Sequence, residues 1–546
     1  MRKRPAGSGL VRGGQAGGQA GGQTGAAGGG AGWWDNFSFR DCRHLRIFEC
    51  EVKPMGSQID EGLLDEKLAI IEGVKSWQPR LISKLESVIR SGDEDTLFRM
   101  NPIRFAREKG VEEEEAIDLF LHSVKAGLFR LNWQLWCPGC GGIVESFDSL
   151  RTLGTHYHCN FCQVNLEATL DDYIEITFAL SPRVRDIEFN HPETLSAEDF
   201  FLRYIFHPEA YFPDGTKFGD AMKKQKPPMF YLEPDAKFEI GMTLPPGTVS
   251  GSDWLNRLDL FLAVAGEPMQ AIEEVDIFLD PGSIRAPKAE LRPGPKVLRF
   301  RNRTALKGAI ILMSHPEGEI HSPLAFPPFL SGKRLFNSQT FRDLFQSETI
   351  QGEEGIAIKD ITVLFTDLKS STALYDRIGD LQAYHLVRQH FGSLARVINK
   401  HGGAIVKTIG DAVMATFLQP AEALGAALGM LDEIDRFNQS NGSKDIVLKI
   451  GIHKGSSIAV TLNERLDYFG QTVNVASRVQ GLAGAEEIYI TQEMYDVPEV
   501  RALIKDHPVN AKDARLKGIQ EKVKVFRVRA RPAEVSAPLR LERLAT

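Results

Sequence analysis

The sequence predicts a multidomain α+β protein. The chain has 546 residues, enough for about three or four domains. Its middle contains runs with the period-two alternation of strands, and its C-terminal third alternates strand-like with helix-like segments. The composition, 42% hydrophobic and 25% charged residues, is ordinary for a globular protein. A formal net charge of −7 argues against a general nucleic-acid binder, and no run approaches the roughly 20 apolar residues of a membrane-spanning helix.

The beginning of the chain is not expected to build a packed core. Residues 1–32 are rich in Gly, Ala and Gln, which predicts a disordered tail. Their basic start is not followed by the continuous apolar region of a signal peptide, so we do not expect export. Residues 33–132 are predicted to be mainly helical, with helices over Leu63–Glu72 and Leu81–Ile89.

Residues 101–132 have the outline of a winged helix-turn-helix. Helices are expected over Asn101–Lys109 and Glu112–Ala126, followed by the strand-like run Leu128–Trp136. The second helix opens with the acidic run Glu112–Glu115, which suits a helix N-terminus but would be repelled by a phosphate backbone. We therefore favour a protein-contact or structural module over DNA binding.

Residues 133–170 are expected to form a zinc ribbon. Two Cys-x-x-Cys pairs carry this prediction: Cys137, Cys140, Cys159 and Cys162. Thiolate pairs at this spacing close a tetrahedral site, so we predict one structural Zn²⁺ with no open position for catalysis. A redox pair is the alternative, and His156 and His158 are close enough to act as substitute ligands. The remaining cysteines, Cys42 and Cys50, show no disulfide framework, which fits a cytoplasmic protein.

Residues 171–332 are expected to form a β-rich module, as a sandwich or a barrel-like fold. Its strand-like runs are Tyr173–Phe178, Leu258–Ala265, Val275–Leu279, Val297–Arg301 and Ala309–Met313. Residues 333–355 form a linker in which Gln339–Glu348 predicts a short amphipathic helix, with Phe341, Leu344 and Phe345 on one face. Nothing in the module names a ligand, so its effector is unknown.

The C-terminal third, residues 356–530, carries the motifs with chemistry; residues 531–546 form a tail. Ile361–Thr366 alternates as a buried strand that ends at Asp367. Two further strand-like runs flank Gly410 and Asp411, which predicts a hairpin with Asp411 at or beside its tip. A helix between them is indicated by apolar residues at helical spacing: Tyr384, Val387, Phe391, Leu394 and Ile398. This topology can bring the two carboxylates side by side.

A Ser/Thr-rich turn follows the first carboxylate and opens a helix: Ser370, Ser371 and Thr372. Carboxylates bind hard cations, and the backbone N–H groups at a helix start face phosphates. Together these elements are what a nucleoside triphosphate with two Mg²⁺ ions requires.

The motifs FTDLKSST, VKTIGDAVMA, DYFGQTVNVASR and LKG, in this order, resemble the catalytic domain of the class III adenylate and guanylate cyclases. The resemblance runs from about Ile356 to Val528 and implies a ferredoxin-like, palm-type fold. It implies that Asp367 and Asp411 hold two Mg²⁺ or Mn²⁺ ions, helped by the backbone carbonyl of Leu368. The ribose 3′-oxygen then attacks the α-phosphorus and pyrophosphate leaves.

The resemblance also implies roles for five other residues. Asn474 and Arg478 would orient the ribose and stabilise charge on the α-phosphate, and Lys517 would bind the terminal phosphates. Lys407 and Asp467 match the adenine-selecting pair, so ATP is the expected substrate and 3′,5′-cyclic AMP the product. Guanylate cyclase activity is the alternative.

Two residues depart from the family's usual pattern: Ser370, where many relatives have Gly, and Gln471, where Asn or Asp is frequent. Because one chain carries every element, and the family shares its sites between subunits, we expect a homodimer with composite sites. The N-terminal half would regulate it. Two other hypotheses are a zinc-ribbon and winged-helix nucleic-acid binder with a cyclase-derived domain, and an inactive cyclase-like scaffold.

Overall fold

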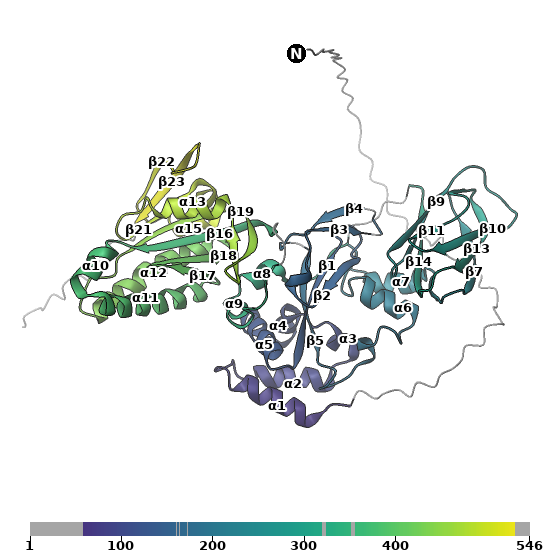
Figure 1. Ribbon diagram of the computed structural model, residues 1–546, viewed down its shortest axis with the longest axis horizontal. Helices are drawn as coiled ribbons and strands as arrows, with labels where there is room; N and C mark the ends of the chain where they lie inside the picture. The colour runs from purple at the N-terminus through teal and green to yellow at the C-terminus, as the bar shows by residue number, and fades with distance from the viewer. Residues whose placement is uncertain are drawn as a thin grey trace, which may run out of the picture.

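The computed structural model describes residues 58–159, 161–162, 164–171, 173–318, 324–350 and 355–529. The tails expected at 1–32 and 531–546 lie outside these residues. Figure 1 shows three parts in a row: the C-terminal domain on the left, a central α/β part, and a β-sandwich on the right. No helix within the described ranges has the length and apolar character needed to cross a membrane.

The central part packs five helices against a four-stranded sheet. The helices are α1 (Glu61–Glu72), α2 (Leu81–Ser91), α3 (Glu94–Phe98), α4 (Pro102–Lys109) and α5 (Glu113–Lys125). The sheet has the order β15-β5-β1-β2 and joins β1 (Phe129–Trp136), β2 (Ile143–Phe147), β5 (Ile174–Leu180) and β15 (Leu330–Ser331). The helix, helix and strand predicted after residue 101 are therefore present.

Local sequence signals set the ends of α4 and the contacts of α5. Asn101 caps α4 by accepting a hydrogen bond from the backbone N–H of Ile103 at 2.9 Å, and Gly110 ends the helix in the left-handed region with φ 59°. In α5, the acidic first turn binds Arg334, whose guanidinium donates to Glu113 at 2.6 Å and to Glu114 at 2.7 Å. The acidic run thus contacts the linker.

The expected domain boundaries at residues 133 and 171 do not separate these sheets. The first boundary falls inside β1, and β5 pairs with β1 from Phe129↔Leu180 to Leu135↔Ile174. The strand predicted at Tyr173–Phe178 thus belongs to the central sheet, because its apolar residues share the core of α1 to α5. The cysteine pairs lie on two hairpins, one between β1 and β2 and one between β3 (His156–Cys159) and β4 (Val164–Glu167). A short 3₁₀ turn, η1 (Leu150–Thr152), precedes β3.

The predicted β-rich module is a two-sheet sandwich with an apolar core between its sheets. The sheets have the orders β11-β10-β13-β7 and β12-β9-β8-β14-β6. Their strands are β6 (Met229–Leu232), β7 (Lys237–Leu244), β8 (Gly247–Asp253), β9 (Leu258–Val264), β10 (Glu273–Asp280), β11 (Ser283–Arg285), β12 (Glu290–Leu291), β13 (Gly294–Asn302) and β14 (Gly308–Pro316). Short helical segments that the sequence did not predict precede them: η2 (Glu188–Asn190), α6 (Ala197–Phe200), the π-helical turn η3 (Phe201–Ile205) and α7 (Phe218–Gln225).

The linker contains α8 (Gly332–Phe336) and α9 (Gln339–Leu344), which is shorter than the predicted helix. Phe341 is fully buried, and its ring lies 6.1 Å from that of Trp133 and 6.2 Å from that of Phe336. The apolar face of α9 therefore packs into the central core.

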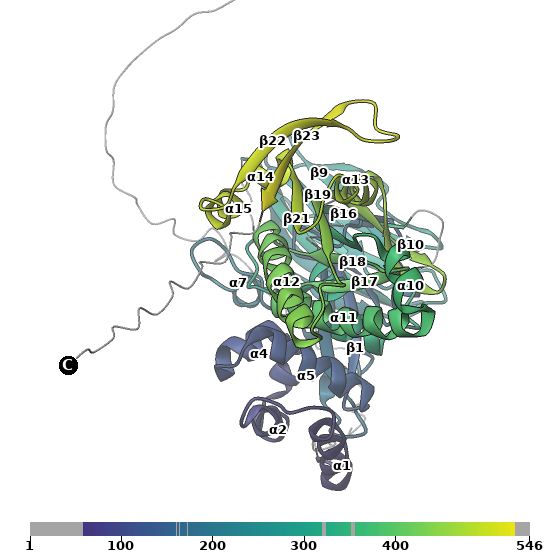
Figure 2. The same cartoon turned by 90° about the vertical axis from the view of Figure 1, so that its left-hand side faces the viewer.

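The C-terminal domain has one large sheet with the order β17-β18-β16-β19-β21-β23-β22, and β20 pairs with β19. Its elements are β16 (Ile356–Leu368), α10 (Ser371–Ile378), α11 (Asp380–Lys400), β17 (Ala404–Ile409), β18 (Ala412–Phe417), α12 (Pro420–Ser440), β19 (Leu448–Leu462), β20 (Arg465–Phe469), α13 (Gln471–Gln480), β21 (Glu487–Thr491), α14 (Gln492–Tyr495), α15 (Pro498–Leu503), β22 (Val509–Arg515) and β23 (Lys522–Arg529). The succession β16-α11-β17-β18-α12-β19 is ferredoxin-like, and α11 and α12 lie together on one face (Figure 2).

One residue of the predicted helix face is placed differently. Tyr384 is 53% exposed, whereas Val387, Leu394 and Ile398 are buried under the sheet. Near the start of α11 the buried position is taken by Ala383 instead.

Candidate active site

Asp367 lies near the end of β16, opposite Lys449 of β19. Leu364 and Leu368 point into the core beneath α11 and α12, so the alternation of the strand directs Asp367 to the other face of the sheet. Lys449 Nζ lies 2.5 Å from Asp367 Oδ2. The sequence analysis missed Lys449, because only the register between β16 and β19 brings the two together.

Asp411 directly follows Gly410 at the turn between β17 and β18, as the sequence predicted. Gly410 has φ 63°, the left-handed backbone that this tight turn requires. Strands β16 and β18 are antiparallel, and Thr366 pairs with Val413. Asp367, directly after Thr366, and Asp411, two residues before Val413, therefore both lie at the same end of this ladder. Asp411 Oδ2 is buried and has no hydrogen-bond partner among the described residues. A second carboxylate close to a buried, unpaired carboxylate oxygen fits a divalent cation.

His390 of α11 is a further group that the sequence analysis missed. It is fully buried, and within the described chain both ring nitrogens lack a hydrogen-bond partner. Burial lowers its pKa to about 4, while the charge of Asp411 acts in the opposite direction. The imidazole is therefore neutral at physiological pH. Its position on a predominantly apolar helix face gave no functional signal in the sequence.

The turn after β16 holds Ser370 in the left-handed region, with φ 61° and ψ 34°. A residue with a β-carbon in this conformation carries a strain of about 1 kcal/mol, which glycine would avoid. Ser371 begins α10 and Thr372 follows it, so their backbone N–H groups belong to the first helical turn. The turn therefore presents backbone N–H groups at the start of α10.

Lys407 and Asp467 are in direct contact. Lys407 Nζ bonds to Asp467 Oδ2, and Asp467 Oδ1 accepts from the backbone N–H of Tyr468 at 2.8 Å. Lys407 comes from the edge strand β17 and Asp467 from β20, so elements 60 residues apart in sequence meet here. The pair is a donor beside an acceptor, held at a largely buried carboxylate.

Asn474, Arg478 and Lys517 are exposed. Asn474 and Arg478 lie four residues apart on α13 and share one face, as predicted. Lys517 lies in the turn between β22 and β23, beside Gly518 with φ 82°.

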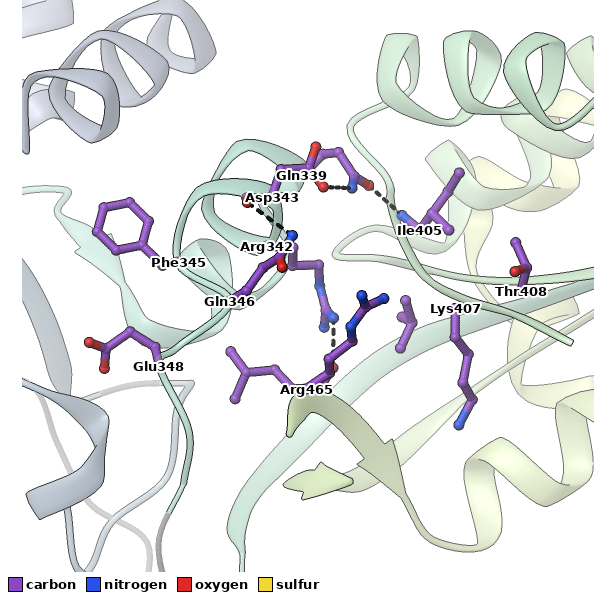
Figure 3. A pocket seen from close by; sticks show the side chains of 12 residues that line it. Gln339, Arg342, Asp343, Phe345, Gln346, Glu348, Ile405, Lys407, Thr408 and Arg465 are labelled. Carbon is purple, nitrogen blue, oxygen red and sulfur yellow. Dashed lines mark hydrogen bonds between the residues drawn. The ribbon is translucent and has the colours of Figure 1, made fainter. Parts of the chain in front are cut away.

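A cavity of about 240 Å³ separates α9 from β17 and β20, and Lys407 is one of its lining residues (Figure 3). Two side chains of α9 cross this space. Gln339 Oε1 accepts from the backbone N–H of Ile405 at 2.8 Å, and Arg342 Nη1 donates to the carbonyl of Leu466 at 3.0 Å. Both hydrogen bonds link α9 to the backbone close to the Lys407–Asp467 pair: Ile405 lies two residues before Lys407, and Leu466 directly precedes Asp467. The sequence predicted an apolar face for α9, but not the polar contacts of Gln339 and Arg342 on its other side.

The four cysteines of the two knuckles converge on one point. Cys137 Sγ lies 3.8 Å from Cys162 Sγ, Cys140 Sγ lies 3.6 Å from Cys159 Sγ, and all four sulfur atoms lie within 4.8 Å of one another. A tetrahedral zinc with Zn–S bonds of 2.3 Å separates its sulfur ligands by about 3.8 Å, so the cluster fits this ion. The neighbouring histidines instead bond to side chains: His156 to Thr155 and His158 to Asn165, each at 2.9 Å.

Comparison with known proteins assigns the two halves of the chain to different families. The Family of unknown function (DUF5939) matches residues 65–343, and the Adenylate and Guanylate cyclase catalytic domain matches residues 355–529. An adenylate cyclase of Anabaena cylindrica is 30% identical over 203 residues, which are 33% of this chain and 40% of that protein. The pH-sensitive adenylate cyclase MT1302 of Mycobacterium tuberculosis is 30% identical over 198 residues, which are 34% of this chain and 47% of that protein. The chain thus spans less than half the length of these relatives.

Among solved structures, the adenylyl cyclase CyaB of P. aeruginosa is 24% identical, with 33% of this chain and 98% of that chain covered and a TM-score of 0.29. The DUF5939 match includes slightly more than half of the 546 residues. The chain therefore belongs to this family of unknown function, and it carries a class III adenylate and guanylate cyclase catalytic domain at its C-terminal end.

Proposed function

We propose that the chain is an adenylate cyclase that converts ATP to 3′,5′-cyclic AMP and pyrophosphate. The observation that carries this proposal is the contact between Lys407 and Asp467. A lysine donor suits the acceptor N1 of adenine, and a carboxylate suits its exocyclic amine. Guanine presents a protonated N1 and a carbonyl, which would leave both charged groups mispaired at a cost of about 1–3 kcal/mol each.

Asp367 and Asp411 would hold two Mg²⁺ or Mn²⁺ ions, with the backbone carbonyl of Leu368 as a further ligand. When bound, the ions lower the pKa of the ribose 3′-hydroxyl and neutralise charge on the triphosphate. The turn Ser370–Thr372 would offer its backbone N–H groups to the phosphates, and Lys517 would bind the terminal ones. The 3′-oxygen forms a bond to the α-phosphorus while the bond to the β-phosphate breaks and pyrophosphate leaves.

A homodimer with two composite sites is supported by what one chain leaves exposed. Asn474 and Arg478 lie open to solvent, where they could orient the ribose and stabilise the α-phosphate of a nucleotide held by a second copy. Large apolar side chains of the same domain are also exposed; Ile458 and Phe469 are cross-strand partners, 36% and 60% exposed. Exposed apolar patches are typical of interaction surfaces.

The Cys137, Cys140, Cys159 and Cys162 cluster would hold one structural Zn²⁺. With four thiolate ligands no position remains for substrate, so the ion would serve folding alone. We assign regulation to the N-terminal half, because α9 of that half contacts β17 and β20 on either side of the base-selecting pair.

Incubation of the purified chain with ATP or GTP, in Mg²⁺ or Mn²⁺, tests the activity. Cyclic AMP should be the main product, and Asp367→Asn or Asp411→Asn should lower kcat at least about 10³-fold because each removes a metal-binding charge. Asp360→Asn, which changes an exposed carboxylate of the same strand, is the control and should retain activity. Cyclic GMP as the main product would refute the base assignment, and an active Asp411→Asn variant would refute the metal assignment.

Subunit mixing tests the composite site. Asp367→Ala and Arg478→Ala chains should each be inactive alone, yet recover activity when mixed, because one of the two sites in a heterodimer is then intact. Product formation is measured after subunit exchange has been verified by mass. Exchange without recovered activity would mean that each chain builds its own site.

Zinc content can be tested by replacing the knuckles. The double variant Cys137→Ser, Cys162→Ser should lose one zinc per chain in metal analysis and lose hydrogen-exchange protection in β3 and β4, since binding and local folding are coupled. Cys42→Ser, Cys50→Ser is the matched control and should keep both. A native chain without zinc would contradict the assignment.

The role of α9 can be tested with a single substitution. Arg342→Ala should lower kcat/KM for ATP about tenfold, because a shift of about 1 Å in a substrate-positioning group is costly, and it should reduce the preference for ATP over GTP. Gln346→Ala is the control, because Gln346 lines the same cavity but, among the described residues, bonds to Asp343 of its own segment and not to the cyclase domain. Equal kinetics for both variants would exclude α9 as the connection.

A further inference from the structure

A second cavity, of about 400 Å³, lies in the family region of unknown function, far along the sequence from the cyclase motifs. It opens between the central sheet, the end of α3 and the segment that follows η3. Its volume is that of a small-molecule site. Six of its lining residues carry the argument: Arg99, Gln134, Glu175, Thr177, Arg203 and His207.

Four of these polar side chains are almost completely buried. Gln134 and Thr177 are 2% exposed, His207 3% and Glu175 4%. Glu175 and Thr177 alternate with apolar residues in β5, so they share the face of the sheet opposite the central core. Burying a polar group costs free energy unless the group is hydrogen-bonded. Each of these side chains therefore requires a hydrogen-bond partner, either in the protein or in a ligand.

The structure satisfies some of these groups and leaves one without a partner. His207 Nδ1 accepts from the backbone N–H of Glu209 at 3.2 Å, so Nε2 carries the proton that it donates to Glu175 at 2.9 Å. The Glu175 carboxylate is therefore held by the His207 imidazole. In contrast, Thr177 Oγ1 is buried and has no hydrogen-bond partner among the described residues.

Arg99 supplies a positive charge to the same wall. Its guanidinium donates to the carbonyl of Arg203 at 2.7 Å, and from Nε to the amide oxygen of Gln134 at 2.8 Å, with the Gln134 amide turned to accept. Burial lowers its pKa to about 10, so it stays charged at neutral pH. No ion pair joins Arg99 to a carboxylate in the described part of the chain, whereas Arg203 pairs with Asp95 at 3.0 Å.

We propose that this cavity binds a small carboxylate that carries a hydroxyl or ammonium group next to its carboxylate. The ligand's carboxylate would accept hydrogen bonds from the Arg99 guanidinium, which has N–H groups to spare. Its neighbouring donor would meet Thr177 Oγ1 and the Glu175 carboxylate. Arg104 and Arg203 pair with Glu209 and Asp95, and Lys217 and Lys223 are exposed at the edge of the cavity. Arg99 is therefore the buried cation that would recognise the anion.

Calorimetry on the full-length chain, without nucleotide, tests the site with four probes: L-lactate, L-alanine, acetate and inorganic phosphate. Lactate or alanine should bind with a Kd of about 1 mM or below. Acetate, which lacks the second donor, and phosphate should bind at least about tenfold more weakly. Whether lactate or alanine binds better distinguishes a hydroxy acid from an amino acid.

Two variants and a control complete the test. Thr177→Val should weaken binding of the better probe about tenfold, and Arg99→Gln about 10- to 100-fold; Arg107→Gln, an exposed arginine of α4, should not change it. Thr177→Val removes an unpaired buried hydroxyl, so this variant is expected to fold. It therefore tests the site even if Arg99→Gln does not fold. Absence of saturable binding to every probe, or unchanged binding by Thr177→Val, would overturn the proposal. Because binding is measured directly, the result is independent of cyclase activity.

Discussion

One hydrophobic core joins the N-terminal half to the cyclase domain, and the rest of the structure depends on it. Its buried members run without interruption from Leu64 of α1 through Phe341 of α9 to Val363 and Tyr468 of the cyclase sheet. Protein interiors are packed as densely as crystals, so a displacement on one side of such a core is felt on the other. Removal of the N-terminal half would expose apolar residues on one face of the cyclase sheet to water. The stability of the cyclase domain therefore depends on the N-terminal half.

The candidate active site beside Asp367 contains energetically unfavourable features that no contact among the described residues offsets. Asp411 Oδ2 is buried and finds no partner in the part of the chain that the structure describes, which costs about 1–3 kcal/mol. Ser370 has a left-handed backbone conformation. Strain and unpaired polar groups gather at functional sites because binding can repay them. The two carboxylates differ in this respect, since Lys449 already neutralises Asp367. A cation entering the site would therefore gain more from Asp411.

The sequence was most informative where function and local pattern coincide. The strand ending at Asp367, the hairpin at Asp411 and the paired cysteines were predicted because spacing alone reveals them. Lys449 and Arg342 were missed because their partners are distant in the sequence. Lys449 meets Asp367 through the pairing of β16 with β19, and Arg342 meets Leu466 where the linker contacts the cyclase domain. Helical spacing predicted the apolar face of α11, but it does not show how far the neighbouring elements cover that face. Tyr384, near the start of the helix, is exposed. Glu175 and Thr177 alternated as a polar strand face, but only the tertiary structure shows that this face is buried.

Strand β1 has two faces with different tasks. Gln134 holds the Arg99 guanidinium on one face, and the adjacent Trp133 packs against Phe341 of α9 on the other. Because successive side chains of a strand point to opposite faces, a shift of the β1 backbone would displace both contacts. Any coupling between two sites is reciprocal, so a molecule that changes nucleotide affinity when bound beside Gln134 would have its own affinity changed by the nucleotide by the same factor. If the proposed small carboxylate binds there, the family region of unknown function would act as a metabolite sensor for the proposed nucleotide site.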